Sequence, residues 1–132
     1  MRTRKFQKLS DASLEIMKIV WKNGESSINQ IFESINARRN TKLKRATVQV
    51  QLRRLENYGW LSHRLEGREY LYSALREREE ATRLIVDDVR NRLFGGSSSE
   101  LVRFLFKDLT IDSSELERIK EMMRKFKPGE SS

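Results

Sequence analysis

The chain contains no cysteine, one proline and a single histidine among its 132 residues. Without cysteine there is no disulfide, no thiolate nucleophile and no cysteine-ligated metal site. The lone His63 offers no histidine cluster for zinc. We therefore expect no metal site and no cofactor, and any catalysis would depend on carboxylates and lysines.

Long apolar runs are also absent. No apolar stretch approaches the roughly 20 residues that span a bilayer, and no signal-peptide core follows the basic N-terminus. We expect a soluble, cytoplasmic protein without a membrane partner. The acidic pairs Glu79-Glu80 and Asp87-Asp88 are poor candidates for catalysis, because neighbouring side chains on a helix point about 100° apart. Enzymatic activity is accordingly not expected.

Positive charge is concentrated in the first half of the chain. Residues 1–75 hold 15 Lys and Arg against 7 Asp and Glu, whereas residues 76–132 hold 12 of each, so the first part carries the whole formal charge of +8. A positive field confined to one region attracts a polyanion and makes its binding sensitive to salt. Nucleic acid is the favoured partner, ahead of an anionic membrane surface. We divide the chain into domains 1–75 and 76–132.

Hydrophobic spacing predicts three short helices in the first domain, after a basic arm at Met1–Lys8 that has no periodicity. The first helix follows the capping residue Ser10 and stops at Gly24. The second follows Ser27 and ends near Ala37. Together with a third helix they form a helix-turn-helix bundle.

The third helix is predicted to begin around Lys44–Ala46 and to end at Tyr58-Gly59. Its apolar stripe is Val48, Leu52 and Leu55. We place four polar residues on the opposite, free face: Lys44, Thr47, Gln51 and Arg54. Their hydroxyl, amide and cationic groups are the types that pair with base edges and phosphate oxygens.

Two strand-like runs follow at Trp60–Leu65 and Glu69–Ser73, with Glu66-Gly67 as turn material. They predict an antiparallel hairpin, or wing, whose tip carries Arg64 and Arg68. We expect the two tyrosines of the second strand to pack against the helices: Tyr70 and Tyr72.

Three further helices are predicted in the second domain, the last starting at a variant capping box, Asp112 to Glu115. Their apolar stripes are too wide to be buried within so short a segment, so we expect a homodimer. The alternative is that these helices fold back on the first domain. The expected interface residues are Leu84, Ile85, Val89, Leu101, Leu105, Leu116, Ile119, Met123 and Phe126. A further stripe position is Leu109. The predicted fold class is mainly α with a small antiparallel β-hairpin, a winged helix-turn-helix plus a C-terminal three-helix dimerisation region.

The order of these segments, from about Leu9 to Phe126, resembles the BlaI/MecI family of bacterial penicillinase and methicillin-resistance repressors. The resemblance is carried by Leu14–Trp21 with Gly24, Thr47-Val48 with Leu52, Arg54-Leu55 with Gly59, Glu66-Gly67-Arg68 with Tyr70 and Tyr72, and the Phe94–Ser97 junction. It implies a winged-helix repressor that binds a palindromic DNA operator as a dimer and blocks transcription.

In that family the third helix enters the major groove and the wing lies along the DNA backbone. Carried onto this sequence, the implied base contacts are Arg45, Thr47, Gln49, Gln51 and Arg54. The implied DNA backbone contacts are Ser27, Lys42, Lys44, Arg64 and Arg68. A protein-interaction or RNA-binding module, and a transcriptional activator, remain alternatives.

Two departures from the family bear on how the DNA would be released. Antibiotic-responsive members are cleaved at an Asn-Phe bond, which this sequence lacks; the corresponding helix contains Glu100–Phe106. Copper-responsive relatives carry C-terminal cysteine pairs, which are absent here. The sequence therefore predicts neither of these release mechanisms, and it leaves the operator and the target genes open.

Overall fold

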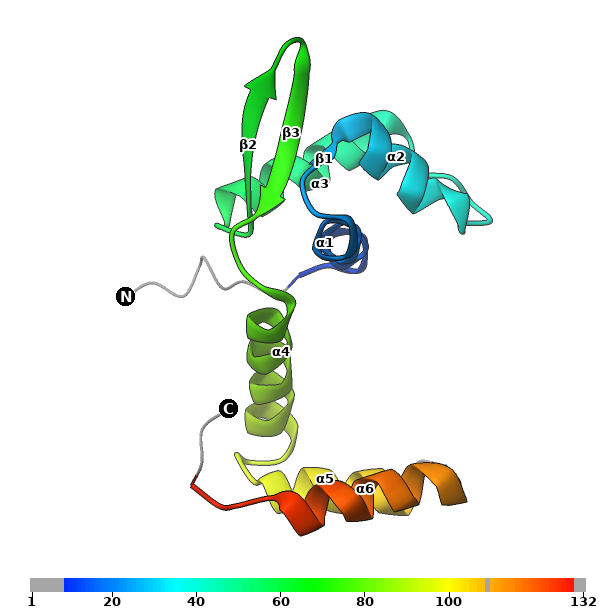
Figure 1. The fold of residues 1–132 in the computed structure, drawn as a ribbon, viewed down its shortest axis with the longest axis vertical. Coiled ribbons are helices and arrows are strands. Elements are labelled where there is room, and N and C mark those ends of the chain that lie inside the picture. The colour runs from blue at the N-terminus through cyan, green and yellow to red at the C-terminus, as the bar shows by residue number, and fades with distance from the viewer. Residues whose placement is uncertain (1–8, 109, 130–132) are drawn as a thin grey trace. The chain divides into compact units, whose positions relative to one another are not determined.

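The computed structural model describes residues 9–108 and 110–129 (Figure 1). The predicted arm at Met1–Lys8 and the stripe position Leu109 lie outside these residues. The elements, in chain order, are α1 (Asp11–Asn23), β1 (Ser26–Ser27), α2 (Ile28–Ala37), α3 (Arg45–Asn57), β2 (Leu61–Glu66), β3 (Glu69–Ala74), α4 (Arg78–Leu93), α5 (Ser98–Asp108) and α6 (Ser113–Lys125). They form two compact units that divide within α4, between Asp87 and Asp88. The sequence-based division into a DNA-binding domain, 1–75, and a dimerisation domain, 76–132, assigns functions to the two parts and stays a prediction.

The predicted helix boundaries in the first unit are confirmed, and local hydrogen bonds explain them. At the start of α1 the Ser10 hydroxyl accepts from the Ser13 amide at 3.1 Å, and Gly24, with φ of +80°, ends the helix. A capping box starts α2: the Ser27 hydroxyl accepts from the Gln30 amide at 3.1 Å, and the Gln30 side chain accepts from the Ser27 amide at 2.8 Å.

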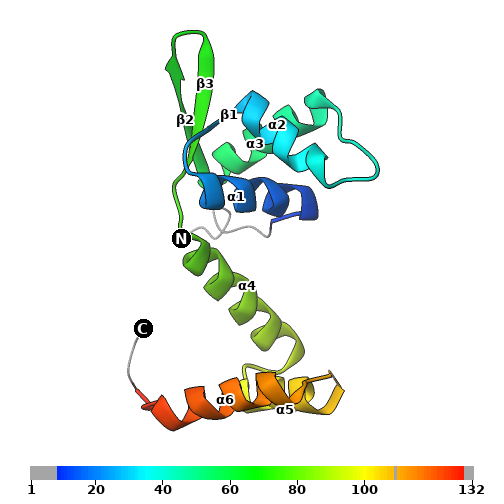
Figure 2. The same ribbon diagram turned by 45° about the vertical axis from the view of Figure 1, so that its right-hand side comes forward.

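The predicted hairpin is present and belongs to a three-stranded antiparallel sheet. Strands β2 and β3 pair from Leu61 opposite Ala74 to Glu66 opposite Glu69, with Gly67 in the turn at φ of +65°. The third strand, β1, pairs with the other edge of β3, giving the order β1-β3-β2. Within the first unit the β2-β3 hairpin extends past the helices (Figures 1 and 2). The first unit is therefore a winged helix-turn-helix.

The described core lies in the first unit, and it includes the start of α4. Its buried hydrophobic residues are Ile16, Met17, Val20, Ile31, Ile35, Val48, Leu52, Leu55, Trp60, Leu61 and Ala81. Leu84 packs partly buried against this core, because it lies one turn after Ala81 on the same face of α4. Its assignment to the dimer interface stays a prediction. The Trp21 indole N–H donates to the Arg76 carbonyl at 2.8 Å and fixes the segment before α4.

In the second unit, no side chain among the described residues is buried. The rings of Phe94 and Phe104 meet at 5.9 Å and join the end of α4 to α5. At the start of α6 the Asp112 carboxylate accepts from the Glu115 amide at 2.8 Å, which is the Asp112 half of the predicted capping box. None of the helices within residues 9–108 and 110–129 is both long and apolar enough to cross a bilayer.

Candidate nucleic-acid interface

The exposed face of α3 is polar and cationic. Val48, Leu52 and Leu55 are buried as predicted. Two of the predicted base-contact residues on α3, Thr47 and Arg54, are exposed. The predicted contact Gln49 is also exposed, together with Ala46, Val50, Arg53 and Asn57.

Sequence reasoning missed Arg53, Asn57 and Val50, although helical spacing alone places them directly opposite the buried stripe. The Arg53 guanidinium and the Asn57 carboxamide are groups that recognise base edges. Val50, which is 40% exposed, is an apolar side chain that could pack against a thymine methyl group. The exposed face of α3 therefore offers more kinds of contact to DNA than the predicted base-contact residues alone.

Gln51 does not lie on this free face, which corrects its predicted placement. Its carboxamide oxygen accepts from the Ser13 hydroxyl at 2.7 Å, and Ser10 adds a longer hydrogen bond at 3.5 Å. The side chain is half-buried between α1 and α3. Because an amide needs both its oxygen and its nitrogen for bidentate contact with adenine, Gln51 in this conformation holds the two helices together instead.

The basic residues before α3 and at its start have partners within the protein. The Arg45 guanidinium donates to the Asn29 carboxamide oxygen at 2.5 Å and lies 5.6 Å from the Phe32 ring centre. The Lys42 ammonium donates to the Asn36 and Arg39 carbonyls, at 2.7 and 2.9 Å, and so closes the end of α2. One of its three N–H donors is left for another acceptor. Lys44, the residue before α3, is exposed.

Ser27, predicted to contact the DNA backbone through the amides at the start of the second helix, already has partners within the protein. It is 4% exposed, lies in β1, and uses both its hydroxyl and its amide in the capping box of α2. A phosphate at this helix start would therefore have to be bound by the following amides, at Ile28 and Asn29, which an N-terminal turn leaves without helical partners.

The two arginines of the wing have different environments. Arg64 donates to both carboxylate oxygens of Glu25, at 2.8 and 2.9 Å, and to Glu66 at 3.2 Å. This contact lowers the pKa of the Glu25 carboxyl and raises the pKa of the Arg64 guanidinium. No carboxylate in the described part of the chain forms an ion pair with Arg68, which follows Gly67 in the exposed turn. Arg68 is therefore available to a phosphate, whereas Arg64 is already paired.

The other face of the wing carries an aromatic cluster around His63. The His63 imidazole pairs with the Glu56 carboxylate of α3, and its ring centre lies 5.0 Å from that of Tyr70 and 5.6 Å from that of Tyr72. Tyr72 packs against the core as predicted, and this burial raises the pKa of its phenol. Tyr70 is 49% exposed, so its predicted packing was wrong.

The site thus combines hydrogen-bonding and cationic groups on α3 with a basic wing that Glu56 and His63 connect to that helix. Such groups suit a polyanion with readable base edges. Within residues 9–108 and 110–129, no cluster of carboxylates and His63 has a geometry that would hold a metal ion.

Comparisons with known proteins find similar bacterial repressors. The penicillinase repressor of Bacillus licheniformis is 24% identical to this chain, over 94% of this chain and 95% of that protein. The methicillin resistance regulatory protein MecI of Mammaliicoccus sciuri is 23% identical, over 92% and 97%. The solution structure of monomeric Bacillus licheniformis BlaI in complex with the blaP half-operator shares 29% identity and a TM-score of 0.48, covering 57% of this chain and 89% of that one. The family model of the penicillinase repressor matches residues 9–125. Because that match spans nearly the whole sequence, this chain belongs to the penicillinase repressor family.

Proposed function

We propose that this chain is a transcriptional repressor that binds a duplex DNA operator in a sequence-specific manner through α3 and the wing. The observation that carries the proposal is the exposed polar face of α3, together with an exposed Arg68 that forms no ion pair with any described residue, in a chain of the penicillinase repressor family. A DNA-binding repressor acts where the chromosome is, which places it in the bacterial cytoplasm. Binding and blocking need no catalysis, so the proposed activity is not enzymatic.

In this proposal the base edges are contacted by residues on the exposed side of α3: Arg45, Thr47, Gln49, Arg53, Arg54 and Asn57. The DNA backbone is contacted by Lys42, Lys44, Arg68 and the first amides of α2. Arg64 contributes only when a phosphate displaces Glu25. Gln51 supports the site by holding α1 against α3.

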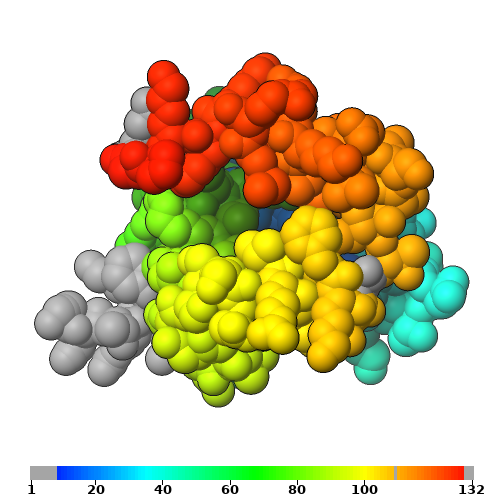
Figure 3. Space-filling view, turned by 90° about the horizontal axis from the view of Figure 1, so that it is seen from below, coloured from blue at the N-terminus to red at the C-terminus, as the bar shows by residue number. Residues whose placement is uncertain are grey.

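The proposed repressor is a homodimer joined by the second unit. Apolar side chains remain exposed over α4, α5 and α6, including Met123 at 67% and Phe126 at 68%. Figure 3 shows one face of α5, in yellow and light orange, and of α6, in orange and red. The predicted contacts that remain accessible are Ile85, Val89, Leu105, Met123 and Phe126, and Phe104, Phe106 and Met122 extend the same apolar surface. A two-fold symmetric dimer presents two copies of α3, which calls for a palindromic operator.

The decisive experiment is selection of bound duplexes from a random pool by the full chain. We expect enrichment of a two-fold symmetric site whose half-sites are centred an integral number of turns apart, at roughly 10 base pairs per turn. An asymmetric single site would contradict the dimer, and a lack of enrichment would contradict sequence-specific binding. Equal retention of single-stranded RNA in a parallel reaction would favour an RNA-binding module. A reporter gene transcribed less when the selected site overlaps its promoter would separate repression from activation.

A further inference from the structure

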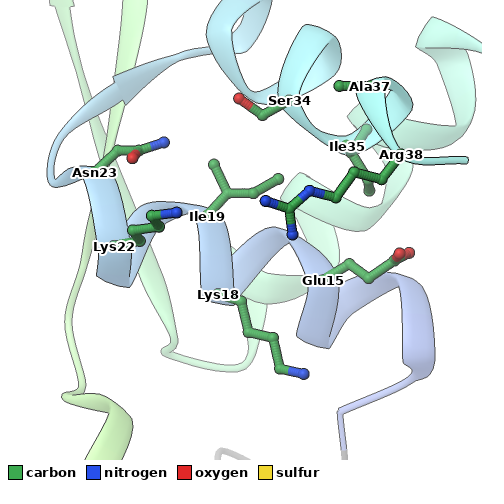
Figure 4. Close-up of a pocket in the computed structure, with 9 residues that line it drawn as sticks. All are labelled: Glu15, Lys18, Ile19, Lys22, Asn23, Ser34, Ile35, Ala37 and Arg38. Atoms are coloured by element: carbon green, nitrogen blue, oxygen red, sulfur yellow. The ribbon is translucent and has the colours of Figure 1, made fainter.

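A second concave surface lies between α1 and α2, and neither α3 nor the wing lines it. Its volume is about 440 Å³, within the range of roughly 300–1,000 Å³ typical of small-molecule sites. Figure 4 shows the groove with α1 on one side and α2 on the other. It is therefore separate from the proposed DNA-contacting face.

The groove is lined by more cationic than anionic side chains. Arg38 extends from the end of α2 toward α1, and its guanidinium lies beside Ile19, with Lys22 on the far side of that residue (Figure 4). The lining carboxylate, Glu15, is already paired with Arg39 at 2.7 Å. Within residues 9–108 and 110–129, no ion pair neutralises Lys22 or Arg38. A cleft lined by charge of one sign concentrates ions of the opposite sign.

The floor of the groove is apolar, whereas its rim can form hydrogen bonds. Ile35 is buried in the core, and Ile19 packs against that core. Asn23 and Ser34 line the same groove with a carboxamide and a hydroxyl. An adjoining hollow carries the carboxylates Glu25 and Glu33, so a negative group is favoured at the Arg38 side. These features together suit a molecule with an apolar body and an anionic head.

We propose that this groove binds a small organic acid, with its apolar ring or short chain on Ile19 and Ile35 and its carboxylate between Lys22 and Arg38. The guanidinium forms paired hydrogen bonds to one carboxylate, and the ammonium supplies a second charge. The proposal does not depend on DNA binding, since no DNA-contacting residue takes part. It assigns to this chain a ligand site distinct from its operator site.

The test is an NMR titration of the isotopically labelled full chain with benzoate, followed through backbone amide shifts. Benzamide serves as the neutral probe of equal shape, and inorganic phosphate serves as the anion without an apolar body. We expect saturable shifts of amides in α1 and α2 with benzoate. Benzamide and phosphate should each bind roughly tenfold more weakly, because each lacks one half of the recognition.

Substitutions on exposed positions then locate the site. Lys22→Gln and Arg38→Gln should each weaken benzoate binding roughly tenfold. Arg83→Gln is the matched control, because it removes the same charge at an exposed position of α4 that does not line the groove. Its benzoate affinity should stay within about twofold of the parent.

Three results would overturn the proposal: no saturable shift with benzoate, phosphate binding as tight as benzoate, or equal losses in all three variants. The last would mean diffuse attraction to a basic surface. All of these readouts are independent of DNA, so their failure leaves the proposed operator binding untouched.

Discussion

At the scale of single residues, the pairing of Arg64 with Glu25 is the contact that we expect to oppose the proposed DNA binding most directly. A phosphate that takes Arg64 must first displace a carboxylate that accepts two hydrogen bonds from it. We predict that Glu25→Gln raises affinity for duplex DNA several-fold at low salt. It should also steepen the dependence of log K on log salt by about one unit, because one more cation then reaches the backbone. Fluorescence anisotropy of a labelled duplex over a salt series measures both quantities.

The matched control is Glu33→Gln, which removes the same charge from an exposed position on α2. Glu33→Gln measures how much the DNA affinity rises simply because the protein has lost one negative charge. A loss of affinity in Glu25→Gln would show instead that Glu25 orients Arg64 toward the DNA.

The same pair predicts a titration. Arg64 holds the pKa of the Glu25 carboxyl below its ordinary value of 4.5. The pair therefore contributes to stability at full strength above pH 4.5, and this contribution is lost as the pH falls through the lowered pKa. Arg64→Gln should move the Glu25 midpoint back up, as followed by carboxyl NMR. An unchanged midpoint would mean that Arg64 is not the cause of the shift.

Arg54 and Arg68 should separate base reading from backbone binding. Both are exposed, one on α3 and the other in the turn of the wing. We predict that Arg54→Ala costs about 1–3 kcal/mol of affinity for the selected operator and little for random DNA. Arg68→Ala should weaken both and lower the salt slope by about one unit. Identical behaviour of the two variants on both DNAs would contradict the proposed division.

At the scale of elements, the start of α2 contributes more to the stability of the fold than the sequence indicated. Ser27 both caps α2 and pairs with β3 as part of β1. We predict that Ser27→Ala lowers the free energy of unfolding by about 1 kcal/mol, through loss of the cap. Ser34→Ala, at an exposed position of the same helix, should change it by less than about 0.5 kcal/mol. Urea denaturation measures both, and equal losses would argue against the cap.

Most helix and strand boundaries could be predicted because their causes are local. Ser10, Gly24 and Asp112 act on their own helix ends, and the alternation in the hairpin is a property of consecutive residues. The strand β1 could not be predicted, since two serines carry no alternating pattern. The inward turn of Gln51 depends on where Ser13 lies, 38 positions away. The exposed face of α3 was predictable in outline, whereas the partners of its polar groups were not.

At the scale of the whole molecule, the described residues bury their core before residue 82 and leave the second unit with apolar surface exposed. We predict that the parent chain sediments as a dimer at micromolar concentration. Met123→Glu should give a monomer with weakened operator binding, because a charge in an apolar interface is costly.

Thr110→Glu adds the same charge at an exposed loop position and should leave the dimer intact. The far-ultraviolet circular dichroism, to which α4, α5 and α6 contribute, checks that Met123→Glu keeps its helices. A parent chain that sediments as a monomer would remove the dimer from the proposal.

The exposed second unit has a consequence for how such proteins diverge. Because no described side chain of the second unit is buried in the core, substitutions there are not constrained by the packing that stabilises the first unit. In the proposed dimer, the choice of partner can therefore change while the proposed operator contacts stay the same. Two related copies in one cell can stop forming mixed pairs without either of them losing its ability to fold.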